Sequence, residues 1–421
     1  MTEHILDDLH WRGLVALTTG DDALRAALSE GPVTLYCGFD PTAPSLHIGN
    51  LVQILTVRRL QDAGHLPLLL VGGATGLIGD PKMAGERTLN PVDVVHGWVE
   101  RIRAQIEPFM SFEGENAARM VNNFDWTKDL TAIELLRDVG QYFRLGTMIA
   151  KDTVARRLNS EEGISYTEFS YQLLQGMDFL ELYRRYGCTL QTGGSDQWGN
   201  LTSGTDLIRK AEGVSVHALA TPLITKADGT KFGKTESGTV WLDPELTSPY
   251  AFYQFWLNQA DADVIGYLKV FTFLSRDEIA RLERAVADEP FKREAQRTLA
   301  HEVTSLVHGP DAVAAAVAAS QAIFGRGELA GLDAATLAGV AQEVPSAVIA
   351  PGASVVDALV EAGIVESRGA ARRAIAEGGA YVNNERVDDE ASVLSAADAL
   401  AGGWIVVRRG KKSVGLVRLE A

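Results

Sequence analysis

Hydrophobic positions divide the chain into regions with different periods. From Val33 to about Lys234, short apolar runs alternate with longer stretches in which apolar residues recur at helical spacing. The runs 33–37 and 66–71 are typical of buried strands, and 48–63 between them follows a helical period. Strands alternating with helices predict βαβ units and a parallel sheet, so we expect an α/β fold here.

The remaining chain follows other patterns. The stretch 249–324 offers no good strand candidate and ends in the alanine-rich run AVAAAVAASQAIF, so we expect helices. Residues 325–352 are rich in Gly, Ala and Pro and are predicted to be a linker. The last 70 or so residues predict two short helices capped by serines, followed by a hairpin at Asn383-Asn384.

Composition narrows the class of protein. With 421 residues, 46% hydrophobic and 22% charged, the chain is long enough for several domains, and disorder or a fibre is excluded as its main character. Two cysteines, Cys37 and Cys188, are too few for a disulfide framework or a zinc site. The N-terminus lacks the pattern of a secretory signal, and no apolar run approaches the roughly 20 residues that a bilayer needs. We therefore expect a cytoplasmic protein.

The net charge of −16 argues at first against a nucleic-acid partner. Residues 352–421, however, carry nine basic and ten acidic side chains, a net −1, so that −15 belongs to residues 1–351. Two basic clusters lie in this C-terminal part: Arg368, Arg372, Arg373 and Arg408, Arg409, Lys411, Lys412. Phosphate contacts and a solvated mixed-charge surface are both consistent with these clusters.

Two segments carry candidate chemistry. In YCGFDPTAPSLHIGN, residues 36–50, a strand leads through a proline-containing loop into a helix near His47, which offers backbone N–H groups and a positive helix end to a phosphate. In GTKFGKT, residues 229–235, two lysines flank a Phe-Gly turn and could clamp a polyphosphate. Taken alone, the first pattern favours a capped helix with a surface histidine, and the second favours a solvated basic turn.

Together these segments resemble the signatures of class I aminoacyl-tRNA synthetases. HIGN at 47–50 is similar to the HIGH signature and KFGKT at 231–235 to the KMSKS signature. The segments YCGFDPTAPSLHIGN, VGGATGLIGDP, ERTLN, YTEFSYQLLQ and GGSDQWGN resemble the bacterial type of tyrosyl-tRNA synthetase, in order along essentially the whole chain.

The resemblance implies an architecture and an activity. We expect a Rossmann-like parallel-sheet catalytic domain with a dimer-forming insertion (1–235), a helical anticodon-arm domain (236–325), a linker (326–351) and a small α+β C-terminal RNA-binding domain (352–421). The implied reaction joins L-tyrosine to ATP, giving tyrosyl-adenylate and pyrophosphate, and then transfers tyrosine to the 3′-terminal adenosine of tRNA(Tyr). ATP is a co-substrate with Mg²⁺ as its counter-ion, the enzyme is a homodimer, and neither a protein-bound metal site nor a prosthetic group is implied.

The family's motifs also assign residues. Catalytic roles fall on Thr42, His47, Lys82, Arg87, Lys231, Lys234 and Thr235. Tyrosine-binding roles fall on Tyr36, Asp80, Asn123, Tyr171, Gln175, Asp178, Gln191 and Gln197. ATP-binding roles fall on Cys37, Gly38, Asp40, His47, Gly49, Asn50, Gly194, Asp196, Lys231 and Lys234. The two basic C-terminal clusters would contact tRNA.

The residues themselves leave some alternatives open. Tyr171, Gln175 and Asp178 are spaced to share one helix face, as a pocket requires, but a merely amphipathic helix has the same spacing. Without the resemblance, Tyr36 and Asp178 would be interpreted as a core aromatic and a helix-surface carboxylate. Two departures from the family also stand out: Asn50 replaces the last histidine of HIGH, and the segment around Lys82 is one residue short, which leaves its role open.

Three other functions compete with the tyrosine-specific reaction. The chain could be an RNA-binding protein that kept a synthetase scaffold without its reaction, but intact Lys231, Lys234, Asp80 and Asp178 argue against this. Tryptophanyl-tRNA synthetase would not call for the pair of Tyr36 and Asp178. A nucleotidylyltransferase with a HIGH-type loop would lack the two C-terminal RNA modules.

Overall fold

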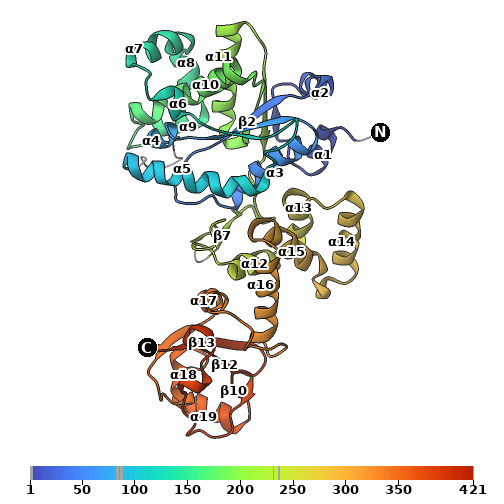
Figure 1. Ribbon diagram of the computed structural model, residues 1–421, viewed down its shortest axis with the longest axis vertical. Helices are drawn as coiled ribbons and strands as arrows, with labels where there is room; N and C mark the ends of the chain where they lie inside the picture. Colours follow the sequence, from blue (N-terminus) through green and yellow to red (C-terminus); the bar gives the residue numbers. More distant parts are fainter. Residues whose placement is uncertain (1–2, 82–84, 86–88, 231, 236–237, 421) are drawn as a thin grey trace. The chain divides into compact units, whose positions relative to one another are not determined.

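The computed structural model describes residues 3–81, 85, 89–230, 232–235 and 238–420, without the side chains of 152, 234 and 235. The chain forms two compact units. The first comprises Met1–Leu242 and Ile265–Ile279, and the second comprises Asp243–Val264 and Ala280–Ala421 (Figure 1).

A six-stranded sheet forms the centre of the first unit, in the order β1-β6-β5-β2-β3-β4. Five strands run parallel, and the short β1 pairs antiparallel with β6. Their bounds are β1 Leu17–Thr18, β2 Thr34–Phe39, β3 Leu66–Val71, β4 Arg119–Asn122, β5 Leu190–Gly194 and β6 His217–Thr221. The α/β expectation for this region is confirmed, including the predicted strands at 33–37 and 66–71.

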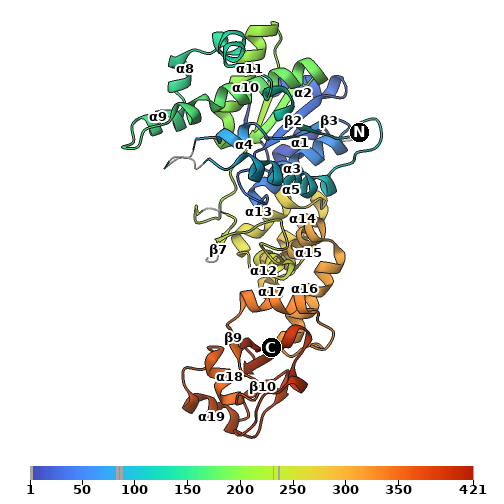
Figure 2. The same cartoon turned by 60° about the vertical axis from the view of Figure 1, so that its left-hand side comes forward.

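Helices cover both faces of this sheet. The helices of the first unit are α1 Ile5–Trp11, α2 Asp21–Glu30, α3 Ile48–Asp62, α4 Thr75–Ile78, α5 Val92–Ile106, α6 Phe124–Thr127, α7 Ala132–Glu134, α8 Leu145–Ile149, α9 Asp152–Leu158, α10 Tyr166–Tyr186 and α11 Trp198–Glu212. In both views α3 and α5 lie on one side of the strands and α10 and α11 on the other (Figures 1 and 2). The core on the second side joins strand residues such as Tyr36 and Leu68 to Met177 of α10 and Leu207 of α11.

The strand order changes direction between β2 and β5. From β2 the chain moves through β3 to β4 on one side, and β5 and β6 are added on the other side. In open parallel sheets, the carboxyl ends of two such strands diverge into a crevice that binds ligands. The topology therefore predicts a site where residues 36–42 and 191–197 meet.

The residues at both ends of helix α10 explain where the helix begins and where it ends. The Ser165 side chain accepts a hydrogen bond from the Glu168 N–H, which caps the first turn. The helix ends at Gly187, whose φ of 64° is left-handed and suits glycine. Along the 21 residues of this helix, Tyr171, Gln175 and Asp178 share one face, as their spacing predicted, and line the same cavity.

The second unit contains helices and a smaller sheet. Its helices are α12 Pro249–Leu257, α15 Glu294–His308, α16 Pro310–Ile323, α17 Ala334–Glu343, α18 Val355–Glu361 and α19 Arg368–Ala376, while α13 Asp261–Phe271 and α14 Arg276–Asp288 contribute residues to both units. Its sheet has the order β11-β10-β12-β13-β9, with β9 Ser346–Ile349, β10 Ala380–Val382, β11 Glu385–Arg386, β12 Trp404–Arg409 and β13 Ser413–Leu419. The helical prediction for 249–324 is confirmed.

The predicted linker 326–351 is corrected by the structure. Asp333 accepts a hydrogen bond from the Thr336 N–H at 2.7 Å and starts α17, because alanines are good helix formers once a cap is present. Further on, β9 pairs in parallel with β13 and completes the sheet. The predicted hairpin is confirmed, with Asn383 and Asn384 at φ of 46° and 69°.

A buried ion pair holds α9 against α10. The Arg157 guanidinium lies 2.7 Å from the Glu168 carboxylate, each side chain is only 2% exposed, and Arg157 also donates to the Gly163 carbonyl. A buried charge without its partner is strongly unfavourable, so this pair fixes the position of the segment between the two helices.

We predict that Glu168→Gln destabilises the first unit by about 3–5 kcal/mol, because it removes the carboxylate charge that lies 2.7 Å from the buried Arg157 guanidinium. Urea unfolding followed by tryptophan fluorescence measures the change. The control is Glu107→Gln, at an exposed pair with Arg103 whose atoms lie 3.3 Å apart. Its effect is expected to stay below about 1 kcal/mol. Equal effects of the two substitutions would contradict the prediction.

Candidate active site

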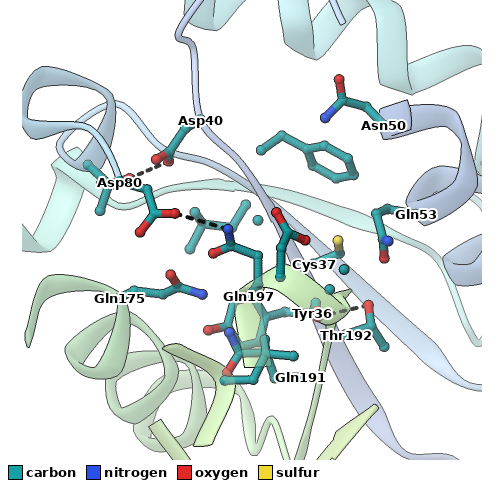
Figure 3. A pocket seen from close by; sticks show the side chains of 18 of the residues that line it. Tyr36, Cys37, Asp40, Asn50, Gln53, Asp80, Gln175, Gln191, Thr192 and Gln197 are labelled. Atoms are coloured by element: carbon teal, nitrogen blue, oxygen red, sulfur yellow. Dashed lines mark hydrogen bonds between the residues drawn. The ribbon is translucent and has the colours of Figure 1, made fainter. Parts of the chain in front are cut away.

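A cavity of about 390 Å³ opens at the carboxyl ends of β2 and β5 (Figure 3). Its lining contains most of the predicted tyrosine and ATP residues: Tyr36, Cys37, Gly38, Asp40, Thr42, His47, Gly49, Asn50, Asp80, Tyr171, Gln175, Asp178, Gln191, Gly194, Asp196 and Gln197. Asn123 lies behind this lining and is fully buried. Lys82, Arg87 and Lys231 fall outside the described residues, and of Lys234 and Thr235 only the backbone, in the short strand β7 (Lys234–Thr235), is described.

Tyr36 and Asp178 are buried together in this cavity. Tyr36 is 1% exposed, packs against the Phe179 ring at 5.2 Å, and its hydroxyl has no hydrogen-bond partner among the described residues. The two oxygens of Asp178 accept hydrogen bonds from Asn123 Nδ2 and Trp126 Nε1, each at 2.9 Å. Asp178 is thus held in place by two neighbours, and the Tyr36 hydroxyl beside it is available to a ligand.

Burial changes the protonation of this pair. Burial raises the pKa of Asp178 to about 7, although the bonds from Asn123 and Trp126 act in the opposite direction. Burial and the nearby Asp178 raise the pKa of Tyr36 well above its usual value. Tyr36 thus keeps its hydroxyl proton, while Asp178 changes charge close to neutral pH.

Tyr171 and Asp40 contact each other directly. The Tyr171 hydroxyl donates to Asp40 Oδ2 at 2.6 Å, and the Thr75 hydroxyl donates to Asp40 Oδ1 at 2.6 Å. Burial raises the pKa of Tyr171 well above its usual value. Tyr171, which is predicted to bind tyrosine, thus contacts Asp40, which is predicted to bind ATP. The two predicted binding regions therefore meet at this pair.

Asp80 is surrounded by amide groups. Gln197 Nε2 donates to Asp80 Oδ2 at 3.0 Å, and Asn200 Nδ2 donates to Asp80 Oδ1 at 2.9 Å. Figure 3 shows Asp80 and Gln197 facing each other, with Gln175 close by. The side-chain oxygens of Gln175 and Gln191 are buried without a partner among the described residues. Buried polar atoms of this kind normally bind water or a ligand, so these oxygens indicate a polar ligand.

The HIGN segment forms the start of α3. His47 Nδ1 accepts a hydrogen bond from the Gly49 N–H at 3.0 Å, and Asn50 Oδ1 accepts one from the His47 N–H at 3.1 Å. Because Nδ1 accepts, the proton of the neutral ring lies on Nε2, which can donate. Asn50 therefore has a capping role that an amide can fill.

The backbone of the KFGKT loop lies beside this turn. A Cβ on Gly233, which has a φ of 82°, would come within 2.8 Å of Ile48 Cγ1. The Ile48 N–H donates to the Val240 carbonyl at 3.2 Å, and the Val240 N–H donates to the Gly233 carbonyl at 3.1 Å. The structure therefore brings the two signature segments together, although 180 or so residues separate them.

Gly194 and Cys37, both predicted to bind ATP, also line this cavity. A Cβ on Gly194 would lie 2.5 Å from Asp196 Oδ1, so a larger residue would displace that carboxylate. Cys37 is buried, and burial raises the pKa of its thiol to about 12, so the thiol stays protonated at neutral pH.

The sequence also matches known proteins. The family model of class I tRNA synthetases (W and Y) matches residues 28–325, and that of the tyrosine–tRNA ligase SYY-like C-terminal domain matches residues 336–417. The tyrosine–tRNA ligase of Streptomyces avermitilis is 66% identical over 416 residues, 99% of each chain, and that of Corynebacterium efficiens is 56% identical over all of both chains. The chain belongs to the tyrosine–tRNA ligase family.

Solved structures agree with this membership. The C-terminally truncated mitochondrial tyrosyl-tRNA synthetase of Coccidioides posadasii is 34% identical, with a TM-score of 0.66 over 75% of this chain and 91% of that one. A tryptophanyl-tRNA synthetase from Encephalitozoon cuniculi, 14% identical with a TM-score of 0.54, shares the fold alone. The tyrosine–tRNA ligase assignment therefore rests on the whole-chain identity and the C-terminal domain match.

The basic C-terminal residues occupy different environments. Arg368 and Arg372 lie 2.7 and 3.6 Å from carboxylates of Asp357 and Glu390 and are mostly exposed. Arg408 is 6% exposed and stacks on the Tyr381 ring at 4.8 Å. A second cavity, of about 1130 Å³, is lined by Arg408 of β12, by Lys411 and Lys412 of the turn after β12, and by Arg297 and Arg326. Arg373 and Arg409 are exposed on α19 and at the end of β12.

Some site residues were not found from the sequence. Trp126 and Thr75 hold Asp178 and Asp40, and Asn200 holds Asp80, yet their positions in the chain show no spacing that links them to these carboxylates. Asn200 ends the GGSDQWGN segment, which was the one signal in the sequence that could have identified it.

In the described parts of the chain, no cluster of His, Cys, Asp or Glu suits a metal ion, and no helix is long and apolar enough to cross a membrane.

The raised pKa of Asp178 predicts a dependence of stability on pH. The folded chain keeps the Asp178 proton up to about pH 7, whereas the ordinary value is 3.8, so the stability that the protonated form contributes is lost as the pH rises from about 4 through 7. Asp178→Asn lacks this titration. We expect its thermal midpoint to fall less than that of the wild type between pH 5 and 8, and parallel curves would contradict the assignment.

Proposed function

We propose that the cavity at β2 and β5 is where this tyrosine–tRNA ligase activates L-tyrosine with ATP, forming tyrosyl-adenylate and pyrophosphate, before transferring tyrosine to the 3′-terminal adenosine of tRNA(Tyr). The observation that carries the proposal is the buried Tyr36 hydroxyl without a described partner, next to the Asp178 carboxylate. A phenol hydroxyl needs one donor and one acceptor, and this pair offers both.

The pair explains discrimination between amino acids. Phenylalanine would bury the same ring but leave Tyr36 and Asp178 without the group that they bind, and unpaired buried polar groups are costly. For this enzyme family, such a site is the standard example of rejection by about 10⁵ without editing. An indole offers only an N–H donor, so it would leave the buried Tyr36 hydroxyl without an acceptor, which argues against tryptophan.

The α-ammonium and carboxyl groups of tyrosine have their own candidates. Asp80 carries a negative charge for the ammonium, and the unpaired Gln175 oxygen and the Tyr171 hydroxyl lie in the same cavity. The amide of Gln197 is a donor for the carboxyl group, and the Gln191 oxygen is a further acceptor. Asn123 acts behind the pocket, through its hydrogen bond to Asp178.

ATP would occupy the side of the cavity formed by α3. The Nε2 proton of His47 and the first-turn N–H groups near Gly49 can donate to phosphate oxygens, as helix N-termini commonly do. Asp196 is a candidate acceptor for ribose hydroxyls, and Gly194 allows adenine to approach closely. Cys37, Gly38, Asp40 and Asn50 complete this side, and Thr42 lies where it could reach the leaving phosphates.

The reaction needs no enzyme nucleophile, because the carboxylate of tyrosine attacks the α-phosphate of ATP. Catalysis then consists of positioning the reactants and stabilising the charge that develops on pyrophosphate. We assign this stabilisation to His47, Lys231, Lys234 and Thr235, with Lys82 and Arg87 as further candidates. Mg²⁺ would accompany ATP as the counter-ion of its phosphates.

The tRNA would contact the second unit. The basic cavity lined by Arg408, Lys411 and Lys412, together with exposed Arg409, supports binding to a phosphate backbone, and Arg368, Arg372 and Arg373 form another basic surface on α19. Such contacts make the affinity for tRNA fall as the salt concentration rises.

The two cysteines, which are buried and free, support a reducing, cytoplasmic location.

A homodimer is supported by one exposed apolar surface. Between α7 and the start of α10, large apolar side chains are exposed in one stretch of the chain: Ile133, Leu136, Leu145, Ile149, Leu158 and Tyr166, at 44–71%. Contiguous exposed apolar residues are typical of an interface, and we propose that a second copy of the chain covers them.

Amino-acid-dependent ATP–pyrophosphate exchange tests the proposed function. We expect exchange with tyrosine and essentially none with phenylalanine or tryptophan. Exchange with tryptophan would indicate the other aromatic synthetase, and no exchange with tyrosine, in a chain that still binds RNA, would favour the RNA-binding alternative.

We predict that Lys234→Ala lowers the rate of tyrosine activation about 10²–10³-fold with little change in tyrosine affinity, because it removes a charge that acts on the transition state. Stopped-flow measurement of adenylate formation gives both quantities. Lys226→Ala, on the same loop but outside the KFGKT segment, is the control and should be nearly normal. A normal rate for Lys234→Ala would contradict its assigned role.

We predict that Leu145→Asp converts the dimer to a monomer, because it places a charge in an apolar interface. Light scattering after size exclusion measures the molecular mass. Phe291→Asp is the control, since Phe291 is 78% exposed but lies in the second unit. A wild-type chain that is monomeric at micromolar concentration would contradict the interface.

A further inference from the structure

Asp80, Gln197 and Asn200 form a closed triangle of hydrogen bonds. Besides the two amides that donate to Asp80, Asn200 Nδ2 donates to Gln197 Oε1 at 3.0 Å. A carboxylate can only accept, so both amide nitrogens must face Asp80. The triangle therefore sets which way the Gln197 amide points.

Asn200 occupies a supporting position in this triangle. It lies in the first turn of α11, three residues after Gln197, so the two side chains project from adjacent positions on the helix. Asp80 and Gln197 are part of the described cavity lining, whereas Asn200 lies behind them. Any effect of Asn200 on a ligand must then pass through Asp80 and Gln197.

The turn that carries Asn200 is held by a half-buried lysine. Lys151, which precedes α9, donates through Nζ to the Gly199 carbonyl and to the Ser203 hydroxyl. A Cβ on Gly199 would lie 3.2 Å from Lys151 Cδ, so the lysine stem packs directly on this turn. Burial lowers the pKa of Lys151 to about 8, which reflects the cost of placing an ammonium there. None of the predicted binding or catalytic roles uses this side chain.

We propose that Asn200 is a positioning residue for the tyrosine ligand and that Lys151 holds Asn200 in place through the first turn of α11. This inference rests on the proposed function, since Asp80 and Gln197 receive the ammonium and carboxyl groups of tyrosine. Asn200 keeps the Asp80 carboxylate and the Gln197 amide in their receiving orientations before the ligand arrives. Lys151 also ties these groups to the segment 132–158 that bears the exposed apolar surface.

Removing the side-chain amide of Asn200 should weaken recognition of the ammonium and carboxyl groups of tyrosine, but not recognition of its phenol. In Asn200→Ala, Gln197 can rotate and Asp80 loses a donor, so the KM for tyrosine should rise about tenfold while the KM for ATP stays unchanged. 4-Ethylphenol keeps the phenol but lacks the ammonium and the carboxylate, so its inhibition constant against tyrosine should not change. General damage to the pocket would weaken both ligands.

The experiment measures tyrosine-dependent ATP–pyrophosphate exchange for the wild type, Asn200→Ala, Lys151→Met and the double variant. Asn159→Ala is the matched control, an exposed asparagine whose amide donates to Ala155 on its own helix. If Lys151 acts through Asn200, Lys151→Met raises the tyrosine KM as well, and the double variant is no worse than Asn200→Ala.

Several outcomes would overturn the inference. The positioning role of Asn200 is contradicted if the KM for tyrosine is unchanged in Asn200→Ala. It is also contradicted if the inhibition constant of 4-ethylphenol rises as much as the KM for tyrosine. Additive effects of the two substitutions remove the link to Lys151. A wild type without tyrosine-dependent exchange contradicts the proposed function instead, so the two failures are distinguishable.

Discussion

The parallel pairing of β2 with β5 is the constraint on which the site depends. The pairing sets Tyr36 opposite Gln191. Thr192, the residue after Gln191, lies 156 positions from Tyr36 along the chain, yet its hydroxyl donates to the Tyr36 carbonyl. Because the strand order changes direction here, the carboxyl ends diverge and leave room for a ligand. Tyr36, the α3 turn and the GGSDQWGN segment all take their positions from these two strands.

A group of carboxylates is the second feature that organises the cavity. Asp178, Asp80 and Asp40 lie close together, and each accepts hydrogen bonds from neutral amide, indole or hydroxyl donors rather than from a described cation. Hydrogen bonds from neutral donors lower the cost of placing these carboxylates in the cavity. Burial raises the pKa of Asp178 to about 7 against the effect of these hydrogen bonds, which makes stability sensitive to pH.

Much of the fold could be predicted from local pattern. Apolar runs located β2 and β3, helical spacing located α3, and the spacing of Tyr171, Gln175 and Asp178 correctly placed them on one face of α10. The linker prediction was wrong over residues 334–349, because alanine and glycine content does not distinguish a loop from a helix that is capped by Asp333 or from an edge strand that is stabilised by its neighbour. Pairing with β13 is a long-range contact that no window of sequence contains.

The sequence by itself determined which chemical groups are present and which short elements carry them, since caps, turns and side-chain spacing depend on neighbouring residues. It also supplied the family, because the motifs occur in order along the whole chain. The tertiary structure decided which groups meet: Trp126 with Asp178, Thr75 with Asp40, and Asn200 with Asp80. It also decided the protonation of Asp178 and the orientation of Gln197, because desolvation and hydrogen bonds arise only when distant segments pack around the same buried atoms.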